Sequence, residues 1–185
     1  RMRRKGASAV ESSIVAVGAI AAMPHARAGE QLLKSGEVLL IDVGCRCQGY
    51  RSDLTRTYIL GKAPARVGRV YRAVRDAYEA ARALIRPGIA LGEVDRVARD
   101  VIAKAGFESN FIHRLGHGIG LDPKEEPYAV AGNPTQCLPG HTFSVEPGVY
   151  FPGKFGLRLE DVVVVTETGN EALSDLPRDL GVLPI

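Results

Sequence analysis

Two stretches of the chain place apolar residues three and four positions apart, which is the spacing of one helix face. The first stretch runs from Pro64 to Ile85 and stops at Pro87-Gly88. The second runs from Val94 to Ala105, and Gly106 ends it. We therefore expect two amphipathic helices in the middle of the chain.

Four β-rich runs are expected to pair into two hairpins. Residues 38–43 and 53–60 flank the polar turn Gln48-Gly49. Residues 142–150 and 157–166 flank a second turn at Pro152-Gly153-Lys154. The section between them that is rich in Gly and Pro, residues 116–139, is predicted to be loop.

The N-terminus imitates a secretory signal, because basic residues at 1–5 precede an apolar run at 13–23 and Ala26-Arg27-Ala28 follows. We reject that interpretation because the chain begins with Arg and because Glu11 interrupts the approach to the run. The run is too short to span a bilayer, so no membrane partner is expected. It is predicted to be a buried strand.

The composition is typical of a globular domain. Of 185 residues, 45% are hydrophobic and 24% are charged, which lets one domain, residues 1–185, bury a real core. The net charge is +3, but residues 1–5 hold four of the 24 basic side chains, so no nucleic-acid partner is expected. Three cysteines, an odd number, give no disulfide framework, which predicts a cytoplasmic protein.

Each expected hairpin holds two carboxylates. The midpoint between Asp42 and Asp53 lies in the first turn region, and the midpoint between Glu146 and Glu160 is Gly153 in the second turn. Residues related in this way lie opposite each other with side chains on one face. Because both hairpins carry such a pair of carboxylates, we predict a single domain with internal pseudo-symmetry.

Four carboxylates buried together repel one another strongly unless cations neutralise them. Two divalent metal ions balance four negative charges. His117, between glycines in Gly116-His117-Gly118, adds an imidazole, and this mixed oxygen and nitrogen set suits Mn, Co, Fe or Zn better than Ca. A pair of such ions is the usual apparatus for amide hydrolysis. Any one of the five residues alone is typical of an ordinary surface, so the prediction depends on their joint spacing.

Five sequence blocks resemble the signature of the pita-bread metallopeptidases, with the aminopeptidase P and prolidase subgroup nearest. The blocks are Ile41-Asp42-Val43-Gly44, Tyr50-Arg51-Ser52-Asp53-Leu54-Thr55-Arg56-Thr57, Gly116-His117-Gly118-Ile119-Gly120, Val145-Glu146-Pro147-Gly148 and Arg158-Leu159-Glu160-Asp161. The resemblance implies an α+β fold, a pseudo-symmetric curved antiparallel sheet with helices outside. It also implies that the five residues ligate two metal ions and that Glu146 accepts the proton of the bridging water.

Three further residues gain a role from the resemblance. His25 and His113 stand where family histidines line the substrate site, although histidines held in the structure are the ordinary alternative. Arg158 matches a family arginine near the active site. Its alternative role is an ion pair that holds a carboxylate in place.

The chain departs from the family pattern at Lys124, which stands where a third active-site histidine is usual. An ammonium there donates to a substrate oxyanion, or else it points to solvent and leaves the site impaired. Helices that usually begin the family's catalytic domain have no counterpart, so the domain is expected to be N-terminally incomplete. Apolar faces left uncovered favour a homodimer.

These observations favour a metallopeptidase with two metal ions, manganese foremost, that cleaves the bond before proline in dipeptides or at the N-terminus of peptides. The related methionine aminopeptidases separate their two glutamates by a longer stretch of chain, and creatinase lacks the complete carboxylate set. Two alternatives stay open: a related enzyme with a non-peptide substrate, and an inactive metal-binding homologue. Cys45 and Cys47 are interpreted as reduced hairpin residues rather than as a second metal site.

Overall fold

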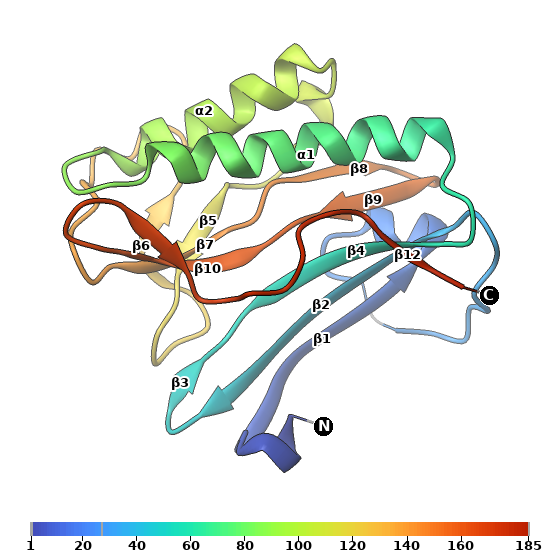
Figure 1. The fold of residues 1–185 in the computed structure, drawn as a ribbon, viewed down its shortest axis with the longest axis horizontal. Coiled ribbons are helices and arrows are strands. Elements are labelled where there is room, and N and C mark those ends of the chain that lie inside the picture. The colour runs from blue at the N-terminus through green and yellow to red at the C-terminus, as the bar shows by residue number, and fades with distance from the viewer. Residues whose placement is uncertain (1, 27, 185) are drawn as a thin grey trace.

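The structure is a computed structural model that describes residues 2–26 and 28–184. Arg1 and Arg27, which belong to the signal-like pattern, lie outside the described residues. Helices α1 (Ala65–Leu84) and α2 (Leu91–Lys104) lie together on one side of the strands (Figure 1). The predicted α+β class is therefore confirmed.

Both helices follow from the apolar spacing. Helix α1 begins directly after Pro64, whose backbone is extended, and ends at Leu84 before Pro87. Its buried face includes Val70, Val74 and Ala77, and that of α2 includes Val94, Ala98 and Ile102, so each helix turns a continuous apolar stripe to the core. The predicted bounds differ from the observed ones by at most three residues.

The first sheet contains the N-terminal strands in the order β1-β2-β4-β12, with β3 paired to β2. All neighbours are antiparallel except β12, which runs parallel to β4. The bounds are β1 (Ala9–Val17), β2 (Val38–Cys47), β3 (Tyr50–Arg51), β4 (Leu54–Leu60) and β12 (Gly181–Leu183).

The predicted buried N-terminal strand is only partly correct. Strand β1 lies at the edge of the sheet, and the side chains of Val10 and Val15 are exposed. The remainder of the apolar run forms a 3-10 helix, Gly18–Ala22. Gly18 has a φ of 54°, a left-handed conformation in which the chain leaves the strand.

The second sheet has the order β11-β10-β7-β5-β6, and β8 and β9 form a separate ribbon. The bounds are β5 (Gly116–Gly118), β6 (Glu125–Ala129), β7 (Thr142–Val145), β8 (Gly148–Phe151), β9 (Phe155–Arg158), β10 (Asp161–Val165) and β11 (Asn170–Ala172). Short 3-10 helices occur at Arg3–Lys5 and Glu108–Asn110.

Two predictions about this half of the chain are wrong. The second hairpin is not two long strands, because the ladder is interrupted at Glu146-Pro147 and at Leu159-Glu160. The section 116–139 is not all loop, because it contains β5 and β6. The glycines of β5 are required by close backbone approach: a Cβ on Gly116 would lie 1.8 Å from the carbonyl oxygen of Ser144.

The main hydrophobic core lies between the two helices and the strands beneath them. Tyr78, Phe143 and Leu157 are among its largest fully buried side chains. A search of the described helices finds none that combines the length and the apolar character needed to cross a membrane.

Candidate metal centre

The turn of the first hairpin places its two aspartates side by side rather than directly opposite. Gln48 and Gly49 both have positive φ, 51° and 90°, and form a two-residue turn. Asp42 therefore faces Thr55, and Asp53 stands two positions before Thr55. The prediction of direct opposition is wrong by two residues. Because side chains alternate along a strand, this even shift keeps both carboxylates on the same face.

The second hairpin has the register predicted from its carboxylates. Gly148 pairs with Arg158 on the ribbon, and Val145 pairs with Asp161 on the sheet. Glu146 and Glu160 lie between these two pairings, so each leaves the ladder at the same level. Glu160 instead forms an isolated antiparallel bridge with Thr55 of β4. This bridge brings the carboxylates of the two hairpins to one place.

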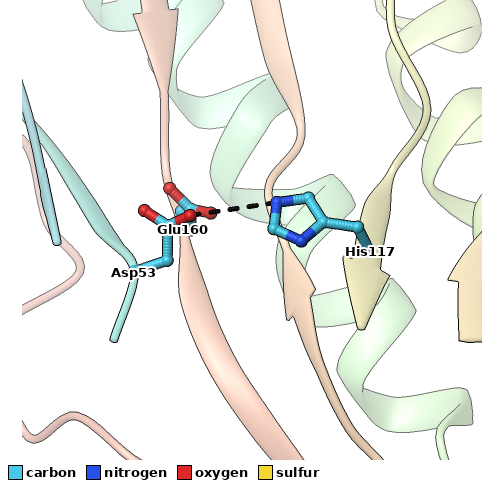
Figure 2. A group of neighbouring side chains, drawn as sticks. All are labelled: Asp53, His117 and Glu160. Carbon is cyan, nitrogen blue, oxygen red and sulfur yellow. Dashed lines mark ion pairs between the residues drawn. The ribbon is translucent and has the colours of Figure 1, made fainter. Parts of the chain in front are cut away.

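His117 of β5 completes the group (Figure 2). Its Nε2 lies 3.8 Å from Oδ2 of Asp53 and 3.3 Å from Oε1 of Glu146. One ligand atom each from Asp53, His117 and Glu160 lies within 4.8 Å of the other two. His117 comes from β5, Asp53 directly precedes β4, and Glu160 directly precedes β10, so distant parts of the chain converge here.

The eight residues predicted to ligate metal or to line the substrate site all contribute to one cavity of about 440 Å³. They are Asp42, Asp53, His117, Glu146, Glu160, His25, His113 and Arg158. Arg114 and Lys124 also contribute to its walls. Lys124 thus lies at the edge of the cavity with its side chain exposed to solvent.

Hydrogen bonds orient the carboxylates that line the cavity but do not occupy every carboxylate oxygen. Oδ2 of Asp42 accepts a hydrogen bond from Arg158, whereas Oδ1 is buried without a hydrogen-bond partner in the described structure. Oε2 of Glu160 accepts from Oγ1 of Thr55 at 2.5 Å. Ser144 Oγ donates to Oε1 of Glu146 at 3.0 Å. A buried carboxylate oxygen without a partner is costly, and a metal ion would satisfy it.

The carboxylates that line the cavity repel one another. Burial raises the pKa of Asp53 to about 7, and the charges of Asp42 and Glu146 add to the effect. Burial also raises the pKa of Glu146, and it raises that of Glu160 well above its ordinary value. Divalent cations between these groups would remove both the repulsion and the cost of burial. The donor set therefore fits divalent metal ions.

The imidazole of His117 is oriented for metal binding. Its Nδ1 lies 3.0 Å from the carbonyl oxygen of Gly118 and donates to it, which leaves Nε2 unprotonated toward the carboxylates. Burial lowers the pKa of His117, so the ring is neutral at physiological pH. A neutral imidazole nitrogen is the form that ligates a metal.

His113 and Arg158 are tied to each other through the hydroxyl of Tyr150. His113 Nε2 lies 3.0 Å from this hydroxyl, and its Nδ1 lies 2.7 Å from the carbonyl oxygen of Arg114. Burial lowers the pKa of His113 to about 4, so it is neutral. Arg158 donates to the Tyr150 hydroxyl at 2.8 Å and forms an ion pair with Asp42. The alternative role predicted for Arg158, an ion pair that holds a carboxylate, is thus present.

Sequence reasoning missed the partners of the carboxylates. Thr55 lies within one of the quoted sequence blocks, and its position two residues after Asp53, on the same strand face, was a usable signal. Ser144 stands two residues before Glu146 in the same relation. Tyr150 carries no such signal. His25 lines the cavity with an exposed side chain, and Cys45, Cys47 and Cys137 are all free thiols.

The architecture is that of the pita-bread fold. Residues 1–167 match the metallopeptidase family M24, and the chain belongs to this family. The resemblance stated from the sequence blocks and the predicted pita-bread fold are therefore confirmed.

Three relatives show how close the match is. The chain is 44% identical to a "Probable dipeptidase PepE" of Mycobacterium bovis over 182 residues, 98% of this chain and 48% of that protein. It is 42% identical to the "Xaa-Pro dipeptidase" of Lactobacillus helveticus, over 94% of this chain and 47% of that protein. The crystal structure of dipeptidase PepE from Mycobacterium ulcerans superimposes with a TM-score of 0.98 at 44% identity, covering 100% of this chain and 50% of that one.

A prolidase structure from Thermococcus sibiricus gives a TM-score of 0.95 at 40% identity, covering 97% of this chain and 49% of that chain. The chain thus spans about half the length of the curated relatives that it matches.

Proposed function

We propose that this chain forms the catalytic centre of a peptidase with two divalent metal ions that cleaves the peptide bond before proline. The observation that carries the proposal is the convergence of four carboxylates and one neutral histidine on one cavity, where Oδ1 of Asp42 has no hydrogen-bond partner among residues 2–26 and 28–184. The proposed ligands are Asp42, Asp53, His117, Glu146 and Glu160. The specificity for proline is supported by the printed names of the relatives, which include Xaa-Pro dipeptidase and prolidase.

A bound metal pair supplies electrophilic assistance and lowers the pKa of a bound water. Glu146 accepts a proton from the attacking water, and Ser144 fixes the direction of its carboxylate. Arg158 holds Asp42 and Thr55 holds Glu160, so both ligands are oriented before substrate enters. We expect manganese, and cobalt, zinc or iron suit the same oxygen and nitrogen donors.

The cavity walls suggest how a peptide is held. His25, His113, Arg114 and Lys124 line the cavity beside the carboxylates, and 440 Å³ is in the range of small-molecule sites. In this proposal the ammonium of Lys124 donates to the negatively charged oxygen that develops at the scissile carbonyl. The substrate is a dipeptide or a peptide N-terminus with proline after the scissile bond. A homodimer, a cytoplasmic location and a single catalytic domain over 1–185 stay predictions.

The test combines metal analysis with a matched pair of substrates. Purified protein dialysed against Mn²⁺ and then freed of excess metal should retain two metal ions per chain. It should hydrolyse a Xaa-Pro dipeptide and leave the corresponding Xaa-Ala dipeptide intact. Retention of metal without hydrolysis of any proline peptide would favour the second candidate, a related enzyme on a non-peptide substrate, for which Lys124 in place of the family's histidine is the supporting observation. Failure to retain metal would contradict both.

A further inference from the structure

Asp161, the residue directly after Glu160, lies outside the cavity and is completely buried. Three donors surround its carboxylate. Arg56 Nη2 donates to Oδ1 at 2.8 Å, and the Tyr78 hydroxyl and Arg178 Nε donate to Oδ2 at 2.6 and 2.7 Å. The proposed chemistry uses none of these groups, so the molecule maintains a buried charged network beside the metal site for another reason.

Arg56 connects this network to Glu160. Its Nη1 donates to the main-chain carbonyl of Glu160 at 2.7 Å, while its Nη2 is held by Asp161. The other side of Glu160 is held by Thr55, which accepts from the Glu160 main-chain N–H at 3.2 Å and donates to Oε2 at 2.5 Å. Glu160 is thus fixed at its amide, its carbonyl and its carboxylate. A shift of the Arg56 guanidinium moves one of these three points.

The same network also holds the segment 174–178, which follows β11. Arg56 donates to the carbonyls of Leu176 and Pro177 at 3.0 and 2.9 Å, and Arg178 Nη2 donates to the carbonyl of Ser174 at 3.0 Å. Arg178 itself belongs to this segment, so Asp161 holds the segment directly through Arg178 and indirectly through Arg56. Its attachment and the geometry of Glu160 depend on one buried carboxylate.

We propose that Asp161 is a positioning residue that acts through Arg56 to hold Glu160 for metal binding, and that it couples the metal site to the segment 174–178. This inference rests on the proposed ligation of metal by Glu160. Coupling between two sites is reciprocal, so metal binding stabilises the attached segment by as much as the attachment strengthens metal binding.

A matched pair of arginine variants tests the coupling. Arg178 contacts Asp161, whereas Arg75 of α1 holds the neighbouring Asp179 through an exposed ion pair at 2.9 Å and does not contact Asp161. Arg178→Met should weaken Co²⁺ affinity, measured by chelator competition, by about tenfold, the lower end of the effect typical of residues that orient ligands. It should also change the visible spectrum of bound Co²⁺. Arg75→Met should leave both unchanged, and Arg178→Lys should restore part of the affinity.

Hydrogen exchange supplies a readout that general destabilisation would not reproduce. Adding Co²⁺ should slow amide exchange in 174–178 in the wild type and in Arg75→Met, but not in Arg178→Met. If Arg178→Met fails to fold, Tyr78→Phe removes one donor from Asp161, and Tyr50→Phe, at an exposed tyrosine of β3, is its control. Wild-type affinity in Arg178→Met or Tyr78→Phe, or equal losses in the matched controls, would overturn the coupling. A wild type that binds no Co²⁺ would instead overturn the metal site on which the coupling depends.

Discussion

The two hairpins that supply the carboxylates are built differently. In the first, β2 and β4 form one uninterrupted ladder from Val38 to Val43, and Asp42 is part of it. In the second, the ladder stops on both strands at the level of the glutamates and resumes beyond them. The main-chain N–H of Glu146 donates to Leu115 and that of Glu160 to Thr55, so partners outside the hairpin replace the missing ladder. Asp42 is placed by its own strand and Asp53 directly precedes β4, whereas the glutamates are placed by the rest of the fold.

This difference indicates how the site is assembled. A continuous ladder sets a side chain's direction with no help from tertiary contacts, because alternation alone decides the face. An interrupted ladder leaves backbone groups that other segments must satisfy, and those contacts connect the ligand to the core. We therefore expect the second hairpin to be more sensitive to remote substitutions than the first.

The largest effect is expected from removing a ligand in either hairpin. Asp53→Ala and Glu160→Ala should each abolish metal retention and lower turnover by more than about 100-fold. The reason is that the remaining side chains no longer provide enough ligands to hold the metal. Metal analysis and a Xaa-Pro dipeptide assay measure the two losses. Glu93→Ala, on the exposed face of α2, is the control and should change neither. Two retained metal ions in either ligand variant would show that the assignment is wrong.

Glu146→Gln separates the role of proton acceptor from that of ligand. The amide keeps the size of the side chain but neither accepts the proton of water nor carries charge, so kcat should fall by about 100-fold to 10,000-fold. Metal affinity should weaken as well. Measuring kcat at saturating Mn²⁺ removes the effect of weaker metal binding and leaves only the effect of losing the proton acceptor. A nearly normal kcat under that condition would show that Glu146 is not the proton acceptor.

Lys124 lies just before β6, outside both hairpins, and tests a part of the site that neither hairpin supplies. An imidazole exchanges protons near neutral pH, whereas an ordinary ammonium does not, so Lys124→His should raise turnover on the order of 100-fold. Metal content should stay the same. Lys154→His, in the exposed turn of the second hairpin, controls for the added histidine. If turnover stays unchanged while the metal content is intact, Lys124 is not the residue that limits turnover.

The smallest effect concerns the stability of the metal-free protein. Because the pKa of Asp53 is raised to about 7 from about 4, the folded state keeps a proton that the unfolded state has released in this range. The free energy of unfolding should therefore fall as pH rises from 4 to 7 in the presence of EDTA. Thermal unfolding should show a Tm lower at pH 7 than at pH 5 by roughly 2 to 8 °C. Asp53→Asn should flatten this dependence, and a Tm that rises with pH without metal would contradict the burial argument.

Much of the candidate site could be predicted because its residues recur at short spacings. The helices followed from apolar periodicity, and the register of the second hairpin followed from the central position of Gly153 between Glu146 and Glu160. The first register was off by two residues because the turn lies at Gln48-Gly49, one position beyond the midpoint of the aspartates. Strand β5 was missed because glycine disfavours strands by propensity, and only the close backbone of Ser144 and of Glu125-Glu126 explains its glycines.

The sequence by itself determined the two helices and the two turns and indicated the proposed donors, because each depends on a local period or on a residue's own chemistry. Only the tertiary structure decided that Glu160 bridges to Thr55 and that Arg56 joins Glu160, Asp161 and the segment 174–178 in one network. These contacts span more than a hundred positions of the chain. Nothing in a local pattern encodes them, because they form only when two sheets and a helix satisfy one another's buried polar groups.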